Sequence, residues 1–501
     1  MTEQTQLPQQ DENHVIAERR AKLKALREAS VDGIAFPNDF RPEQVAAELH
    51  AAHDAKTKEA LEAATPIAVK VAGRIMLKRV MGKASFATIQ DASGRLQLYV
   101  TVDAIGAGAM ETFKHYDLGD IVGAEGTLFK TKTGELSVHV KSVRMITKSI
   151  RPLPEKFHGL ADTEQRYRMR YVDLIMSPEV RNTFVVRSKI VQCMREFMVR
   201  HGYLEVETPM MHPIPGGAAA RPFKTHHNAL DMDVFLRISC GELWQKRLMV
   251  AGYEKVFEIG RIFRNEGMSN EHAQDYTQLE FYFAYANYED GMKLVERMYK
   301  HVAQETFGTQ QFTIRGFEVD LSKVWERYDY RETIKKFTDI DIVDADIPAI
   351  EGVLKRLKVE YNKKGWNRVR AIDTLWKYCR KQLSGPGFLI NIPVEMSPLA
   401  KLSPQGAVVE QFQPIIAGSE VGKGYSELND PIDQAQRFQA QQDMRDAGDE
   451  EAQMYDHEFV EALEHGMPPT CGFGVSERLF AFLADKPIRE VQIFPLLKPK
   501  M

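Results

Sequence analysis

The sequence of 501 residues lacks the features that mark membrane-spanning and secreted proteins. No continuous apolar run approaches the ~20 residues that cross a bilayer. The polar start, residues 1–4, has no apolar core of the kind found in signal peptides. The four cysteines, Cys193, Cys240, Cys379 and Cys471, include no close pair with the spacing of a zinc ribbon. We therefore expect a cytoplasmic protein that has reduced, mostly buried thiols and no contact with a membrane.

The net charge, only −4, gives little indication of a partner. Its distribution is more informative, because Pro66 to Ile150 contains 12 Lys and Arg against 7 Asp and Glu. A basic module attached to an acidic body is a weak indication of nucleic-acid binding. The polar N-terminal region contains a charged helical run from His14 to Glu28. Two interpretations of this run stay open, a solvated helix on a mobile extension or an additional contact to nucleic acid.

Short β-rich runs separated by turn residues fill the segment from Ile67 to Ile146. These runs are Val69–Ala72, Phe86–Ile89, Leu96–Val100, Ile121–Ala124 and Leu136–Val140. Five such runs with glycine-containing breaks predict a small five-stranded barrel. Such barrels commonly bind single-stranded nucleic acid by stacking bases on aromatic side chains in a basic groove. Phe86, which follows Arg79 and Lys83, suits that use, although a phenylalanine in the core is an equal alternative.

The remainder of the chain predicts a different architecture. Arg151-Pro152-Leu153-Pro154 indicates an extended linker. Helical stretches such as 185–200 then mix with β runs that lack a strict β-α-β rhythm, which favours an α+β domain around an antiparallel sheet. We therefore expect an N-terminal helical extension (1–65), a barrel (66–150), a linker (151–160) and an α+β domain (161–501).

One segment of the α+β domain sets a guanidinium and carboxylates among aromatic residues. Val256–Ile259 predicts a strand, Asn265–Asn270 a turn and Leu279–Phe283 a returning strand, which together form an antiparallel hairpin. Arg264 and Glu266 alternate, so their side chains share one face. The guanidinium could bind a phosphate, and Glu266 could accept from an amino group such as that of adenine. Considered alone, an Arg-Xaa-Glu sequence is far more often a surface ion pair.

Two further glycine-containing segments are candidates for phosphate chemistry. In the first, Glu420 and Glu427 would favour Mg²⁺ beside substrate phosphates if the intervening glycines bend the chain, and a solvated acidic loop is the plainer alternative. The glycines around Lys423 miss the spacing of a Gly-Xaa4-Gly-Lys-Ser/Thr phosphate loop, so we reject that interpretation. The second, Gly472–Phe480, permits close backbone approach before an apolar helix, and a helix start with an exposed Arg478 is its plainer alternative.

These segments, in this order, resemble the motifs of class II aminoacyl-tRNA synthetases. Gly202–Pro209 is similar to the first motif, Phe263–Glu266 to the second and Gly474–Arg478 to the third. Further matches are Arg166–Leu174, Ile214–Phe223 and Tyr425–Pro431. The resemblance covers residues 15–500 and is specifically to lysyl-tRNA synthetases of the bacterial type.

The resemblance implies activation of L-lysine with ATP to lysyl-adenylate and pyrophosphate, followed by transfer of lysine to the 3′ end of tRNA-Lys. It gives Arg264 and Arg478 the catalytic roles, because the lysine carboxylate is already an anion and its attack needs charge neutralisation rather than a base. The implied ATP site comprises Arg264, Glu266, His272, Tyr276 and Arg478. The implied lysine site comprises Gly217, Glu242, Arg264, Glu280, Tyr282, Lys423, Tyr425 and Glu427.

The same resemblance implies an OB-type fold for the barrel, a helical insertion near 339–383, and a homodimer that forms through the first motif. It implies Mg²⁺ held by Glu420 and Glu427. The implied anticodon site in the barrel comprises Arg79, Phe86, Gln97 and Glu135. Independent support comes from charge, because a cationic side chain removed from water needs paired carboxylates, and Glu280 and Glu427 would supply two.

The sequence departs from the family pattern at three places. One extra residue precedes Glu242, Lys423 stands where an asparagine is expected, and the third motif is one residue short, with Ser476 in place of a glycine. Three alternatives remain. An aspartyl- or asparaginyl-tRNA synthetase shares this plan, although Glu280 and Glu427 would repel aspartate. A lysyl ligase that modifies a protein typically lacks the barrel, and the intact candidate residues disfavour a catalytically inactive tRNA-binding paralogue.

Overall fold

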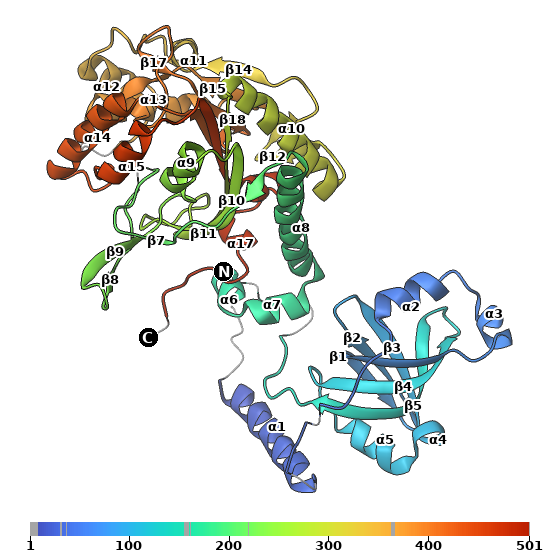
Figure 1. Cartoon of the computed structure of the whole chain (residues 1–501). Helices are drawn as coiled ribbons and strands as arrows, with labels where there is room; N and C mark the ends of the chain where they lie inside the picture. Colours follow the sequence, from blue (N-terminus) through green and yellow to red (C-terminus); the bar gives the residue numbers. More distant parts are fainter. Residues whose placement is uncertain are drawn as a thin grey trace. The chain divides into compact units, whose positions relative to one another are not determined.

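The computed structural model describes residues 9–499 except 31–32, 37, 155–159, 161, 219 and 362–365. The chain divides into two units, residues 1–161 and 162–501 (Figure 1). Among the described residues, no helix has both the length and the apolar character needed to cross a membrane. Each unit is considered by itself below.

The first unit is built on a closed five-stranded barrel. Its strands are β1 (Ala68–Met81), β2 (Ala84–Gln90), β3 (Arg95–Thr101), β4 (Ile121–Lys130) and β5 (Leu136–Thr147), joined in the order β1-β2-β3-β5-β4. Burial alternates along β2 and β3, as expected when one face of a strand packs inside a barrel. Gly82, with φ of 61°, makes the tight turn that joins β1 to β2. The predicted barrel is confirmed.

Short helices complete the barrel core. They are α2 (Ala46–His53), α3 (Lys58–Ala63), α4 (Val102–Ile105) and α5 (Ala107–Lys114). Leu49 of α2, Leu61 of α3 and Phe113 of α5 belong to the same buried cluster as Leu98 and Val138 of the strands. These helices therefore enlarge the buried apolar core beyond what the small barrel provides by itself.

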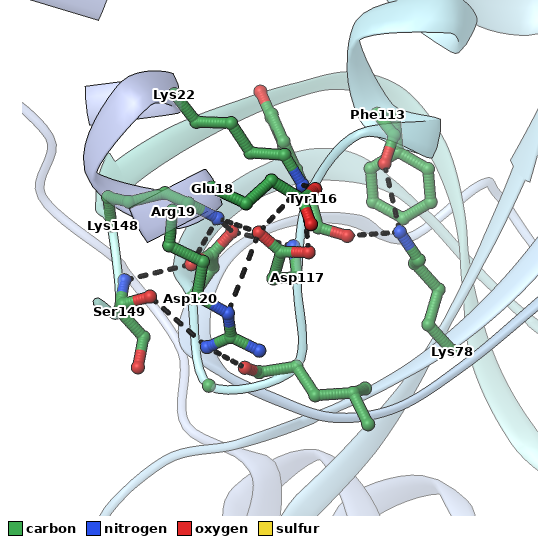
Figure 2. Close-up of polar contacts among 12 residues, drawn as sticks. Glu18, Arg19, Lys22, Lys78, Phe113, Tyr116, Asp117, Asp120, Lys148 and Ser149 are labelled. Carbon is green, nitrogen blue, oxygen red and sulfur yellow. Dashed lines mark hydrogen bonds and ion pairs between the residues drawn. The ribbon is translucent and has the colours of Figure 1, made fainter. Parts of the chain in front are cut away.

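The N-terminal helix α1 (Gln9–Ala29) is attached to the barrel by charge, as Figure 2 shows. The guanidinium of Arg19 donates to the carbonyls of Leu118 (3.1 Å) and Ser149 (3.2 Å), and is buried. Lys22 pairs with Asp117 at 3.1 Å. Of the two open interpretations, the solvated helix does not hold for the face that carries Arg19 and Lys22, because these charged side chains have partners on the barrel. A contact of the outer face with nucleic acid stays a prediction.

A buried ion pair supports that attachment from within the barrel. Lys148 and Asp120 are both almost fully buried, and their charged groups lie 2.7 Å apart. Lys148 also pairs with Asp117, the partner of Lys22 (Figure 2). Because each charge in this network has a counter-charge, burial does not leave any of them unpaired.

The second unit is organised around a nine-stranded sheet. Its order is β14-β15-β18-β20-β21-β11-β10-β6, and β19 pairs with β18. The strands are β6 (Leu204–Glu205), β10 (Lys255–Phe263), β11 (Asp275–Ala284), β14 (Glu326–Asp329), β15 (Gly387–Ile390), β18 (Gln411–Ile416), β19 (Ser419–Glu420), β20 (Lys423–Ser426) and β21 (Thr470–Ser476). The central strands are antiparallel, and only the β6/β10 and β14/β15 pairs run parallel. The expected α+β class is confirmed, as is the predicted hairpin, which is formed by β10 and β11.

Helices cover both faces of this sheet (Figure 1). Helices α8 (Pro178–Arg200) and α10 (Tyr288–Phe307) share one buried cluster with Phe281 of β11. Tyr282, the next residue, belongs to a second cluster with α12 (Ile347–Arg356) and α13 (Arg368–Arg380). Since successive side chains of a strand point to opposite faces, the two clusters lie on opposite sides of β11. Glu280 therefore shares its face with Tyr282.

Capping residues set the bounds of several helices. The Ser177 hydroxyl accepts from Val180 N–H, and Pro178 occupies the first turn of α8. Asn287 and Asp290 form a capping box at the start of α10. The remaining elements are α6 (Thr163–Arg168), α7 (Arg170–Met176), β7 (Met211–His212), β8 (Lys224–His227), β9 (Met232–Leu236), α9 (Glu242–Val250), β12 (Gln311–Ile314), β13 (Phe317–Asp320), α11 (Tyr330–Thr338), β16 (Ile392–Pro393), η1 (Val394–Met396), β17 (Val408–Val409), α14 (Pro431–Asp446), α15 (His457–Glu464), α16 (Arg478–Leu483) and α17 (Ile488–Val491).

Candidate active site

A cavity of about 380 Å³ opens on the face of the sheet that carries Glu280 and Tyr282. Its lining contains all the residues expected to bind ATP, lysine or a metal, although they come from segments more than 200 residues apart. These residues are Gly217, Glu242, Arg264, Glu266, His272, Tyr276, Glu280, Tyr282, Glu420, Lys423, Tyr425, Glu427 and Arg478. The structure thus brings them together at one site, while their individual roles stay predictions.

One end of the cavity is acidic. Glu242, Glu280 and Glu427 are each at most 5% exposed. The ammonium of Lys246, which is fully buried on α9, donates to Glu242 (2.8 Å) and pairs with Glu427. The Tyr425 hydroxyl also donates to Glu242. Two of the three carboxylates therefore share one ammonium.

Lys246 is a residue that sequence reasoning missed. It lies four residues after Glu242 on a helix, and this is the spacing at which oppositely charged side chains face each other. This spacing is the feature of the sequence from which the pairing of Lys246 with Glu242 could have been predicted. Burial disfavours its ammonium, but the attraction of Glu242 and Glu427 prevails and raises the pKa of Lys246.

Glu280 differs from its two neighbours, because no described lysine or arginine forms an ion pair with it. Its carboxylate accepts from Cys240 N–H (2.8 Å), from the Tyr282 hydroxyl (3.3 Å) and from the Gln278 amide. Burial, reinforced by the nearby charge of Glu242, raises the pKa of Glu280 to about 7. The site therefore holds a carboxylate that a cation from outside would complete.

Glu258, in the same hairpin, is a carboxylate that has a cationic partner. It lies directly opposite Glu280 in the β10/β11 pairing. Its carboxylate pairs with the buried guanidinium of Arg237 and accepts from the Thr208 hydroxyl at 2.7 Å. Among the described residues of this hairpin, Glu258 thus has a cationic partner and Glu280 does not.

The extra residue before Glu242 is accommodated in a tight turn. Gly241 has φ of 74° and precedes α9, and a Cβ at this position would collide with the Thr208 side chain. The turn aims Cys240 N–H at Glu280 and starts α9 with Glu242 in the cavity lining. Glycine is required here because its left-handed conformation and the close approach both exclude a side chain.

Basic and aromatic side chains line the other end. Arg264 follows β10, and its Nε donates to the Ile238 carbonyl at 3.1 Å, so its orientation is fixed. Its guanidinium carbon lies 5.9 Å from the centroid of the Tyr276 ring. Burial raises the pKa of Glu266, and burial together with Arg478 lowers that of His272. A neutral imidazole and two guanidiniums are compatible with a bound polyanion.

The segment between β18 and β20 bends as a shared site for Glu420 and Glu427 requires. Gly418 and Gly422, with φ of 72° and 146°, lie on either side of β19, and both glutamates line the cavity. The Trp376 indole donates to one oxygen of Glu420 at 2.5 Å. On β21, a Cβ at Gly472 would collide with Glu427 and Tyr282, so this glycine lets the strand pass close to the acidic end. In the described ranges, no cluster of three or more acidic, His or Cys residues is arranged as a metal site.

The other two departures from the family pattern also lie at the cavity. The ammonium of Lys423 is 5.7 Å from the ring centroid of Tyr425. No ion pair joins it to Glu420 or Glu427, both of which are described, and its desolvation by surrounding protein lowers its pKa. Ser476 ends β21 and accepts from Arg478 N–H at 3.3 Å, so the shorter motif still brings Arg478 to the cavity.

The barrel presents a row of partly exposed aromatic side chains. Phe86 lies outside the buried core cluster, and its ring centroid is 4.7 Å from that of Tyr99. Tyr99 in turn lies 5.7 Å from Phe129 and 5.6 Å from His139. Sequence reasoning missed these three residues, although all of them alternate with buried positions on β3, β4 and β5. Phe86 pairs with Arg79 across β1 and β2.

The other two residues expected at the anticodon site lie on neighbouring parts of the barrel. Gln97, on β3, accepts from the Ser137 hydroxyl at 2.9 Å. Glu135 immediately precedes β5 and is exposed. The geometry thus offers stacking surfaces beside polar groups, which suits the recognition of unpaired bases.

Comparison with known proteins defines the class. The family model described as tRNA synthetases class II (D, K and N) matches residues 162–498, and that described as OB-fold nucleic acid binding domain matches residues 69–146. The fold is thus that of a class II aminoacyl-tRNA synthetase with an OB-fold anticodon domain.

Similar curated proteins narrow the class further. A lysine–tRNA ligase of Variovorax paradoxus is 54% identical, covering 98% of this chain and 96% of the relative. A lysine–tRNA ligase of Laribacter hongkongensis is 52% identical, and the match covers 100% of this chain and 100% of the relative. One of an Azoarcus species is also 52% identical, and the match covers 98% of this chain and 98% of the relative. The chain belongs to the lysine–tRNA ligase family.

Proposed function

We propose that this member of the family activates L-lysine with ATP in the 380 Å³ cavity, and that Glu280 binds the ε-ammonium of the substrate. The observation that carries this assignment is the absence of a protein cation beside Glu280, among the described residues, while Glu242 and Glu427 share Lys246. A buried carboxylate held ready by three hydrogen bonds gains most from a cation that replaces its lost water.

The remaining lysine contacts extend from this carboxylate. Tyr282, Tyr425 and Glu427 surround the same end of the substrate side chain, and Gly217 with Glu242 binds its α-amino group. Lys423 and Arg264 bind its carboxylate, since both are cationic and line the same cavity. An aspartate side chain would face Glu280 and Glu427 here, which disfavours the aspartyl-type alternative.

ATP occupies the basic end. Tyr276 stacks on adenine, Glu266 accepts from its amino group, and His272 and Arg478 bind the distal phosphates. The lysine carboxylate attacks the α-phosphate and pyrophosphate leaves, while Arg264 and Arg478 neutralise the charge that develops. Lysine then passes to the 3′-hydroxyl of the terminal adenosine of tRNA-Lys.

Mg²⁺ is the cofactor that this chemistry favours. One oxygen of Glu420 is held by Trp376, which leaves the other for a cation, and Glu427 lines the same cavity although Lys246 already pairs with it. Two protein carboxylates are few for a metal cage, but Mg²⁺ commonly takes its other ligands from water and substrate phosphates. When bound, the ion would neutralise phosphate charge.

We also infer anticodon recognition by Arg79, Phe86, Gln97 and Glu135, a homodimer, and a location in the cytoplasm, where tRNA and ATP are consumed. Support for the dimer comes from apolar side chains on α8, on β6 and after it, each more than 40% exposed. These are Val185, Val199, Leu204, Met210 and Met211. Exposed apolar side chains are a feature of protein interfaces.

Amino-acid-dependent ATP–pyrophosphate exchange, measured with each amino acid in turn, tests the proposal. We expect exchange with lysine and no comparable signal with aspartate or asparagine. A stronger signal with aspartate would contradict the assigned pocket. No exchange with any amino acid would support the inactive paralogue instead.

A further inference from the structure

An acidic side chain that has no assigned role lies among the arginines of the basic end. Glu271 lines the cavity next to His272. Its carboxylate forms ion pairs with Arg478, at the start of α16, and with Arg315, which lies between β12 and β13. Its Oε2 is also 3.4 Å from the Ser419 hydroxyl. One carboxylate thus joins three segments that are distant in the sequence.

The arginines around Glu271 are themselves held in place. The guanidiniums of Arg315 and Arg478 lie 4.1 Å and 5.4 Å from the ring centroid of Phe482. Arg380, at the end of α13, donates to the Gly418 carbonyl (2.7 Å) and the Ser419 hydroxyl (3.0 Å). Burial alone would raise the pKa of Glu271, but the three guanidiniums lower it.

This cluster has more cationic groups than one carboxylate can satisfy. The Nε atoms of Arg478 and Arg380 are buried and have no hydrogen-bond partner among the described atoms. Buried donors of this kind normally find an acceptor, so their state indicates a site that a larger anion completes. A polyphosphate carries more acceptors and more charge than the carboxylate of Glu271.

We propose that Glu271 is a displaceable counter-ion of the distal-phosphate end of the cavity. Its carboxylate pairs with Arg478, and the phosphates of ATP replace it there when ATP binds. Arg315, which does not line the cavity, retains the displaced carboxylate at the rim. This inference rests on the proposed binding of phosphate by Arg478.

The carboxylate of Glu271 thus competes with any polyanion for Arg478 and weakens the binding of that polyanion. ATP and pyrophosphate must both break the pair between Glu271 and Arg478, so Glu271 lowers the affinity for the product as well as for the substrate. A charge-assisted hydrogen bond in a partly desolvated site changes affinity by about tenfold. Glu271 is therefore expected to favour release of pyrophosphate at the expense of tight ATP binding.

Substitutions of Glu271 and of its partner Arg315 should change the KM for ATP in opposite directions. In Glu271→Gln, the competitor loses its charge, and we expect the KM for ATP and the inhibition constant of pyrophosphate to fall by about tenfold. In Arg315→Met, the displaced carboxylate loses its partner at the rim, so the KM for ATP should rise. In the double variant nothing charged remains to be displaced, and the KM for ATP should match that of Glu271→Gln.

The measurement is lysine-dependent ATP–pyrophosphate exchange by the full chain, with calorimetric titration of ATP as a binding readout. The KM for lysine should stay unchanged in all three variants. Glu289→Gln is the matched control, because Glu289 pairs with Arg327 in the same way but neither residue lines the cavity. We expect no change in its KM for ATP.

Other outcomes would overturn the inference. If Glu271 instead holds Mg²⁺ together with Glu420, Glu271→Gln will raise the Mg²⁺ concentration needed for half-maximal exchange and will not tighten ATP. If Arg315 itself binds phosphate, the double variant will keep the raised KM of Arg315→Met. An equal loss of ATP affinity in Glu271→Gln and Arg315→Met would show that the pair serves the fold alone. Failure of the unmodified protein to exchange with lysine would contradict the proposed function rather than this inference.

Discussion

Replacing Glu280 with glutamine should change lysine binding and protein stability in opposite directions. The change removes one negative charge and keeps the shape of the side chain. A hydrogen bond between charged groups contributes about 1.5–3 kcal/mol. Loss of the charged partner of the ε-ammonium should therefore lower kcat/KM for lysine by about 10- to 150-fold in ATP–pyrophosphate exchange. The KM for ATP should change little, because Glu280 lies at the acidic end.

The effect on stability follows from the buried charge. Burial raises the pKa of Glu280 from its ordinary value of 4.5 to about 7. Ionising the buried carboxyl disfavours the folded state, so the free energy of unfolding falls as pH rises from 4.5 to 7. The total loss is up to ~3 kcal/mol, at 1.36 kcal/mol per pKa unit. Glutamine avoids that cost but keeps only part of the hydrogen bonding, so we expect a gain of about 1–2 kcal/mol in urea unfolding at pH 8. The gain should vanish near pH 4.5.

Glu258→Gln is the matched control, because Glu258 lies opposite Glu280 and is paired with the buried Arg237. Its neutralisation leaves an uncompensated guanidinium and should cost about 3–5 kcal/mol of stability. A fall in stability of Glu280→Gln that matches its loss of lysine activity would refute the reasoning, since it would mean that the carboxylate only holds the fold together. So would an unchanged KM for lysine.

Three further predictions concern pH, the buried ammonium and the barrel. A bound ammonium favours the ionised form of Glu280, so the KM for lysine should fall by up to about tenfold per pH unit as pH rises toward 7 and should level off above it. This pH dependence should be absent in Glu280→Gln. Its persistence in that variant would contradict the assignment. Lys246→Met leaves Glu242 and Glu427 without a counter-charge and should lower the free energy of unfolding at pH 8 by about 3–5 kcal/mol in urea titrations; a loss below about 1 kcal/mol would show that the pair is not needed. Phe86→Ala should reduce tRNA charging by about 1–3 kcal/mol of transition-state stabilisation, the usual contribution of one stacked base, while lysine-dependent exchange stays intact; an equal loss in both assays would contradict the division of labour between barrel and sheet.

Elements with a strong local pattern could be predicted from the sequence. Short β-rich runs separated by glycine-containing breaks predicted the five barrel strands, and the polar turn between two apolar runs predicted the β10/β11 hairpin. The candidate site followed from motifs that keep their order along the chain. The glycines that bend the segment around Glu420 were visible, but the bend itself depends on pairing of β19 with β18.

Contacts between distant segments could not be predicted. The docking of α1 depends on Asp117 and Lys148, which are separated from the helix by most of the barrel sequence. Arg315, Arg380 and Arg478 lie far apart in the sequence and come together around Glu271 only in the folded chain. Such charged residues resemble ordinary surface residues in a sequence, since nothing local distinguishes a buried pair from a solvated one.

Discrimination between lysine and norleucine tests the role of Glu280 most directly. Norleucine has the same carbon chain as lysine and lacks only the ε-ammonium. The ratio of kcat/KM for lysine to that for norleucine, measured by ATP–pyrophosphate exchange, should be high in the unmodified protein and at least about tenfold lower in Glu280→Gln. A ratio that is unchanged by the substitution would contradict the assignment of Glu280 to the ε-ammonium.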